Sequence, residues 1–254
     1  MVINIKLIDK KFGGQKKMAL ILSIETSTKV CSVCISRNGE IEGFRESREE
    51  KSHAKKLTIF IQELLNELII NVDDLDAVAV SKGPGSYTGL RIGVSTAKGL
   101  CFAKDLPLIA INTLQSMAYG IIQKVTSGEF FTDDFENAIL VPMIDARRME
   151  VYSAFFNSKG EFDRDVKAEI IDENSYQEIL SKQKMIFFGD GSEKITEVVK
   201  HENAIFISGI DPSAKDMVQL AQLAFDNKSF EDVAYFEPFY LKDFVATVSK
   251  KKYF

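Results

Sequence analysis

VAVSKGPGSYTGLR, the sequence of residues 78–91, predicts a strand, a glycine turn and a helix in immediate succession. Its apolar, β-branched start favours a buried strand, and the Gly-Pro-Gly segment at 83–85 ends that strand. Ser86 is a typical N-cap residue for a helix that we expect to run from Tyr87 to about Ala103. This layout directs free backbone N–H groups at the start of a helix toward an anion.

The glycine turn has two interpretations. Gly83, Gly85 and Ser86 hold an anion or a nucleotide at the helix N-terminus, or they only form the turn and the N-cap. The turn does not end in the Gly-Lys-Ser or Gly-Lys-Thr of a Walker A phosphate loop. We therefore favour the second interpretation.

The segments around this stretch predict a duplicated α/β fold. We expect strands at 19–24, 30–36, 40–46, 76–81 and 107–111, and helices at 52–70, 87–103 and 113–124. A second hairpin follows at 138–144 and 150–157, then a strand at 166–171 and alternating helices and short strands to about 225. Two such units favour two lobes, at 18–111 and 112–232, flanked by an N-terminal extension (1–17) and a C-terminal tail (233–254).

Composition narrows the functional classes. The 254 residues carry a net charge of −5, without the basic excess of a principal nucleic-acid binder, so we expect contact with nucleic acid to be indirect. No apolar run is long enough to span a bilayer, and residues 1–17 lack the continuous apolar segment of a secretory signal. An odd count of three cysteines fits a reducing cytoplasm. Cys31 and Cys34 have CxxC spacing, but in a strand they face opposite sides of the sheet.

Few residues can support hydrolytic chemistry. The chain has only two histidines, His53 and His201, and the HENAI segment at 201–205 lacks the second histidine of a zinc-binding HExxH motif. No G-x-S-x-G nucleophile elbow occurs. We therefore expect no metal site and no catalytic residue. His53 occupies the first turn of the predicted helix or makes a functional contact, and we favour the former.

Two hairpin turns carry acids after apolar strands, as in the two-lobed sugar kinases, actin and Hsp70-like ATPases, which hold phosphates with an acidic, glycine-containing hairpin in each lobe. The first turn reads IETST at 24–28 and the second reads IDARR at 144–148. Neither contains glycine, so their backbone N–H groups cannot approach phosphate oxygens closely. The pattern favours a retained fold whose catalytic details are degraded.

Two helices offer candidate docking residues. In the helix at 52–70 the apolar side chains span about 180°, whereas packing on one sheet needs roughly 100°. Ile59 and Ile70 fall outside even this arc, and the surplus is met by a partner or by the neighbouring helix. The helix at 87–103 places glycines one turn apart, which favours close approach of another backbone, either in the chain's own sheet or in a partner. The predicted partner interface is Leu57, Phe60, Ile61, Leu64, Leu65, Leu68, Gly89, Leu90, Gly93 and Ala97.

Six segments together resemble the TsaB (YeaZ) family of tRNA threonylcarbamoyladenosine biosynthesis proteins. They are LSIETSTKVCSVCI, SHAKKL, SKGPGSYTGLRIGVSTAKGL, PLIAINTLQSMA, PMIDARRMEVYSAFF and EPFYLKDFV. The resemblance covers Met18 to about Val245, and Lys82 departs from the arginine of many members. It implies a two-lobed actin-like and Hsp70-like ATPase (ASKHA) fold without its own catalytic site.

The resemblance also implies partners. A TsaB-like chain pairs with TsaD, which transfers threonylcarbamoyl to adenosine-37 of tRNAs reading ANN codons, and through that pair works with the ATPase TsaE. ATP and metal are then expected on the partner subunits, with no cofactor in this chain, and tRNA is met through the complex. A homodimer is expected when TsaD is absent.

Two other functional classes stay open at this point. One is a self-sufficient ATP-dependent phosphotransferase of the actin-like fold, and the other is a glycopeptidase-like protease. The missing hairpin glycines disfavour the first and the missing metal ligands disfavour the second. The aromatic-rich tail YFEPFYLKDF, at 235–244, packs on a lobe or docks elsewhere.

Overall fold

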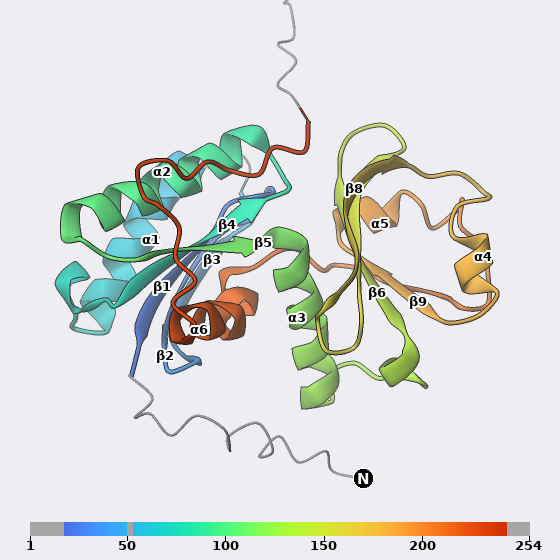
Figure 1. Cartoon of the computed structure of the whole chain (residues 1–254), viewed down its shortest axis with the longest axis horizontal. Coiled ribbons are helices and arrows are strands. Elements are labelled where there is room, and N and C mark those ends of the chain that lie inside the picture. Colours follow the sequence, from blue (N-terminus) through green and yellow to red (C-terminus); the bar gives the residue numbers. More distant parts are fainter. Residues whose placement is uncertain (1–17, 50–52, 243–254) are drawn as a thin grey trace, which may run out of the picture.

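The computed structural model describes residues 18–49 and 53–242, which form two lobes side by side (Figure 1). Each lobe is built on a five-stranded sheet. The expected N-terminal extension (1–17), the start of the first helix at Ser52 and the end of the tail (243–254) lie outside the described residues.

The first sheet has the strand order β3-β2-β1-β4-β5. β1 pairs antiparallel with β2 and parallel with β4, β2 pairs antiparallel with β3, and β4 pairs parallel with β5. Asn38 and Gly39 form the β2–β3 turn at φ of 53° and 79°, left-handed values that these two residue types adopt readily. The bounds are β1 (Leu20–Glu25), β2 (Cys31–Arg37), β3 (Glu40–Ser47), β4 (Ala77–Gly83) and β5 (Leu108–Asn112).

The second sheet repeats this topology in the order β10-β9-β6-β7-β8. β6 pairs antiparallel with β7 and parallel with β9, as β1 does with β2 and β4. The duplicated fold predicted from the sequence is confirmed. The bounds are β6 (Ile139–Asp145), β7 (Glu150–Phe156), β8 (Phe162–Ile170), β9 (Met185–Phe188) and β10 (Ala204–Ile207).

Helices cover both faces of the first sheet. α1 (His53–Glu67) and α2 (Tyr87–Lys104) lie on one face, and η4 (Ala214–Met217) and α6 (Val218–Asp226) lie on the other (Figure 1). β1 is buried throughout because Leu20, Leu22 and Ile24 face α1 and α2, while Ile21 faces α6. We expected residues 112–232 to form the second lobe, but η4 and α6 return to the first sheet.

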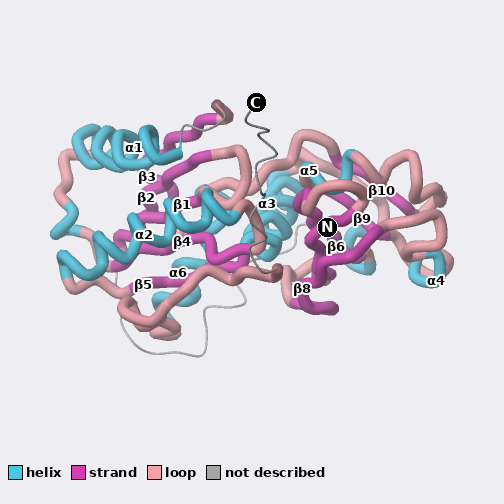
Figure 2. Tube along the Cα trace, turned by 90° about the horizontal axis from the view of Figure 1, so that it is seen from above, coloured by secondary structure: helices cyan, strands magenta, loops and turns pink. Residues whose placement is uncertain are grey.

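The second sheet is covered on one face by α3 (Thr113–Ser127). α3 lies between the two sheets in both views (Figures 1 and 2) and contacts strands of both lobes. The opposite face packs against α4 (Gln177–Leu180) and the segment after α5 (Asp190–Glu193). Short 3-10 helices, η2 (Val72–Asp74) and η3 (Phe135–Asn137), complete the elements. Among the helices of the described residues, none has the length and apolarity needed to cross a membrane.

The three cysteines are buried free thiols. Cys31 belongs to the core beneath α1 and α2, whereas Cys34 packs against Ala214 and Val218 on the other face, so the predicted division of the CxxC pair is confirmed. Burial raises the pKa of the Cys31 thiol to about 11 and that of Cys34 to about 12. The thiols are therefore protonated and unreactive at neutral pH.

Candidate functional site

The glycine turn packs against the first hairpin turn of the same chain. Ser86 Oγ accepts from Gly89 N at 3.3 Å as the N-cap of α2, and Ser86 N donates to Ser27 O at 2.6 Å. A Cβ on Gly85 would lie 2.3 Å from Ser27 O, and one on Gly83 would lie 2.8 Å from Phe239 O. Close backbone approach within the chain thus accounts for both glycines, which favours the turn over an anion site.

The first hairpin turn also packs closely against two glycines of α2. A Cβ on Gly89 would lie 2.0 Å from Thr26 O, and one on Gly93 would lie 2.3 Å from Thr26 Oγ1. Thr26 Oγ1 in turn donates to Gly89 O at 2.8 Å. The backbone that approaches α2 at these glycines is this chain's own. Packing within the lobe therefore explains the spacing of Gly89 and Gly93, and their part in a partner interface stays a prediction.

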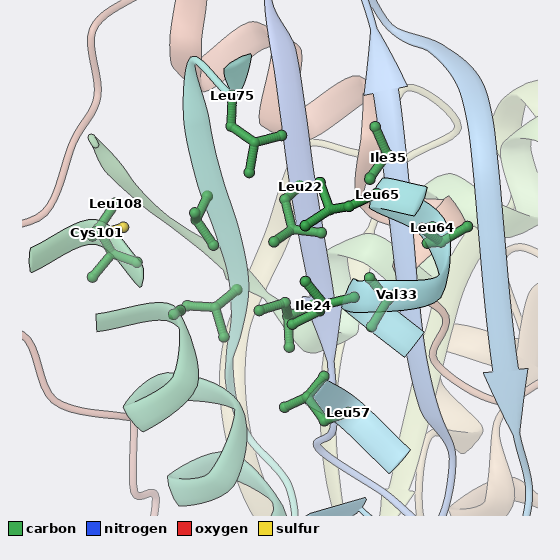
Figure 3. Close-up of a cluster of buried hydrophobic side chains, with 14 of the residues drawn as sticks. Leu22, Ile24, Val33, Ile35, Leu57, Leu64, Leu65, Leu75, Cys101 and Leu108 are labelled. Atoms are coloured by element: carbon green, nitrogen blue, oxygen red, sulfur yellow. The ribbon is translucent and has the colours of Figure 1, made fainter. Parts of the chain in front are cut away.

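The apolar arc of α1 is likewise buried by contacts within the lobe. Leu57, Leu64 and Leu65 point at the sheet residues Leu22, Ile24, Val33 and Ile35 (Figure 3). A wide arc is needed because α1 packs on β2, on β3 and against α2 at once. The other predicted interface residues are buried or pack partly on the same core. Docking of a partner at Leu57, Phe60, Ile61, Leu64, Leu65, Leu68, Leu90 and Ala97 gains no support from this packing and stays a prediction.

What α1 and α2 do leave open is a groove between them, which we call the α1–α2 groove. It has a volume of about 330 Å³. The apolar side chains Ile70, Val72 and Leu100 line it and are only partly buried. The periodicity had set Ile70 apart from the core arc, together with Ile59, which is 49% exposed on α1. The polar lining residues include Thr58, Gln62 and Thr96.

A larger cleft, of about 990 Å³, lies between the two lobes and is lined by both hairpin turns. Glu25, the acid of the first turn, is fully buried and accepts from Ser27 N at 2.6 Å, and burial raises its pKa. Asp145, the acid of the second turn, pairs with Lys194 at 2.5 Å. Burial opposes ionisation of Asp145, but hydrogen bonds from Lys194 and the Arg147 amide lower its pKa. Both acids are thus engaged by the chain itself.

The histidines do not form a metal centre. His53 Nε2 lies 2.9 Å from Thr28 O, which ties the start of α1 to the first hairpin turn. His201 Nδ1 accepts from Asn203 N at 3.1 Å within its own loop. Within 18–49 and 53–242, no group of three His, Cys, Asp or Glu side chains is placed to bind a metal.

The tail folds back over the first lobe, and we call residues 233–242 the C-terminal strap. Val233 and Phe236 pack on the core beneath α2, and Lys98 Nζ donates to the carbonyl of Phe236 at 2.9 Å. The strap then crosses the glycine turn, and Tyr240 packs against Tyr87 with ring centroids 4.7 Å apart and ring planes tilted by 38°. In Figure 1 it runs along α2 toward the second lobe. The sequence had left this placement open.

The comparisons with known proteins match two related families. Residues 35–250 match the family model described as TsaD: tRNA N6-adenosine threonylcarbamoyltransferase. The chain is 30% identical over 235 residues to a protein of Escherichia coli (strain K12) named tRNA threonylcarbamoyladenosine biosynthesis protein TsaB, covering 89% of this chain and 96% of that one.

Two further matches show how much of each chain is similar. The chain is 32% identical over 120 residues to a tRNA N6-adenosine threonylcarbamoyltransferase of Bacillus thuringiensis (strain Al Hakam), which is 41% of this chain but 35% of that protein. The solved structure titled YeaZ from Pseudomonas aeruginosa superposes with a TM-score of 0.74 at 24% identity, over 88% of this chain and all of that chain.

Proposed function

The chain belongs to the TsaB family of tRNA threonylcarbamoyladenosine biosynthesis proteins, and from this membership we propose that it is a non-catalytic subunit that activates TsaD. Coverage distinguishes the two related families, because the chain spans 96% of the TsaB relative but 35% of the threonylcarbamoyltransferase. ATP and metal are then bound by the partner subunits, TsaE acts through the TsaB–TsaD pair, and tRNA is modified within that complex.

One observation carries the non-catalytic part of the proposal. The acids at the two positions where a two-lobed ATPase would hold phosphate are engaged within this chain, Glu25 by burial and Asp145 by Lys194. A phosphotransferase needs such groups free to meet a ligand, so this arrangement supports an accessory role. A metal-dependent glycopeptidase is disfavoured by the shortage of histidines in the sequence.

The α1–α2 groove supports pairing with TsaD. It is an apolar depression between two exposed helix faces, and apolar surface of this kind is typical of a protein interface. The C-terminal strap contacts the opposite side of α2, at Arg91 and Lys98, so it leaves the groove uncovered. Because this chain and TsaD are related in sequence, two similar lobes can pair through equivalent helices. The same surface would join two copies when TsaD is absent.

A charge placed in the groove tests this pairing. In Thr96→Arg the new guanidinium lies among Ile70, Val72 and Leu100 and must lose its water when a partner docks. Arginine favours a helix more than threonine does, so the lobe remains folded. We expect Thr96→Arg to lose co-purification with TsaD.

The matched control is Ser95→Arg, which adds the same charge one residue before Thr96. Ser95 lies on the exposed side of α2, away from the groove. This variant should co-purify with TsaD as the unaltered chain does. Equal behaviour of the two variants, retained or lost, would contradict docking through the α1–α2 groove.

A further inference from the structure

The turn between β6 and β7 holds two successive arginines in an unfavourable backbone conformation. Arg147 has φ of 73° and Arg148 has φ of 53°, both in the left-handed region. The β2–β3 turn of the first lobe also has two successive left-handed residues, but these are Asn38 and Gly39, which suit the conformation. Arginine at both positions therefore works against stability, and such outliers cluster at functional sites.

The turn is held by hydrogen bonds to its surroundings. Asp145 Oδ1 accepts from Arg147 N at 2.8 Å, and Ala146 N donates to Glu150 O at 3.1 Å. Lys194 Nζ bridges the two ends of the turn, with 2.5 Å to Asp145 Oδ1 and 2.6 Å to Glu150 O. We call residues 146–149 the arginine turn.

The two guanidinium groups are available to a ligand. Arg147 and Arg148 are exposed, and neither side chain forms an ion pair or hydrogen bond with another residue of the described chain. Two nearby acids are compensated, since Asp145 pairs with Lys194 and Glu150 pairs with Lys242. A third, Asp190, accepts from Asp145 N at 2.9 Å. The arginine turn thus adds two exposed positive charges to this edge of an acidic protein.

We propose that the arginine turn binds the phosphate backbone of tRNA directly, an inference that rests on the proposed function. Arg147 lines the interlobe cleft whereas Arg148 does not, so the pair straddles the cleft edge. This placement suits a polymer passing over the edge better than a small anion enclosed in the cleft. Guanidinium groups match phosphate oxygens bidentately.

Other groups lining the cleft agree with RNA as the ligand. Lys29 is half exposed, and its Nζ lies 3.7 Å from Asp211, a loose pairing. Tyr87 and Tyr240 lie together on the cleft side of the first lobe, with the Arg91 guanidinium 4.1 Å from the centroid of the Tyr87 ring. An acidic protein surface is the competing ligand of the arginine turn.

The test replaces the arginines by the residue types that suit the turn, in Arg147→Asn/Arg148→Gly. The chain–TsaD pair and the chain alone are titrated with tRNA at several salt concentrations. Loss of two phosphate contacts should weaken tRNA binding by the pair about tenfold or more and reduce the slope of log K against log salt by roughly 1.4 to 1.8. The melting temperature should stay equal or rise, because the left-handed positions are relieved.

The control is Lys182→Ala/Lys200→Ala, which removes two exposed positive charges elsewhere on the second lobe. This variant should keep both affinity and slope. Unchanged tRNA binding by Arg147→Asn/Arg148→Gly would overturn the proposal. Loss of co-purification with TsaD would also overturn it and identify a protein partner for the turn, whereas failure of the unaltered chain to pair at all would instead count against the proposed function.

Discussion

At the scale of single residues, Thr26 fixes how the first hairpin meets α2. Its carbonyl oxygen occupies the space that a Cβ at position 89 would need, and its hydroxyl oxygen occupies the space that a Cβ at position 93 would need. Because the hydroxyl also donates to Gly89 O, hairpin and helix are joined by a hydrogen bond as well as by packing. The glycines therefore stabilise this lobe, whatever docks outside it.

A comparison of two glycines in α2 tests this packing. Gly89→Ala places a methyl group against Thr26 O and should lower the free energy of unfolding by about 1–3 kcal/mol. Gly99→Ala, where nothing lies within 4 Å, should raise it. That gain is about 0.5–1 kcal/mol, because alanine is the better helix former. Urea denaturation measures both, and a stabilising effect of Gly89→Ala would contradict the packing described.

At the scale of elements, the sequence indicates where α1 lies but not what covers it. Its periodicity predicts a helix with a wide apolar arc, and both features are observed. Arc width alone cannot distinguish a partner from β3, where Gly43 leaves room for Leu64 and Leu68. A Leu64→Arg change is expected to unfold the lobe because Leu64 is fully buried.

The C-terminal strap gives a prediction at the same scale. Phe236 packs on the core beneath α2, whereas its neighbour Tyr235 is 84% exposed. Phe236→Ala should therefore lower the free energy of unfolding by about 1–2 kcal/mol, while Tyr235→Ala should leave it nearly unchanged. Equal thermal shifts for the two variants would show that the strap does not pack as described.

At the scale of the whole molecule, the duplicated topology could be predicted because hairpin and α/β signals recur in both halves. The return of η4 and α6 to the first sheet could not be predicted. Their apolar residues indicate that these helices are buried, but not which of the two sheets they pack against. The arginine turn was also missed. The sequence shows Arg147 and Arg148 where a phosphate-binding turn would have glycine, but their left-handed backbone is visible only in the structure.

The central claim is that this chain contributes docking to a catalytic partner and no chemistry of its own. Reconstituted formation of threonylcarbamoyladenosine on tRNA, with TsaD and TsaE and with this chain present or omitted, tests that claim most directly. The account predicts that the reaction needs this chain and that Thr96→Arg fails to supply it while Ser95→Arg succeeds. A rate unchanged by omission of the chain, or threonylcarbamoyl transfer by the chain without TsaD, would contradict it.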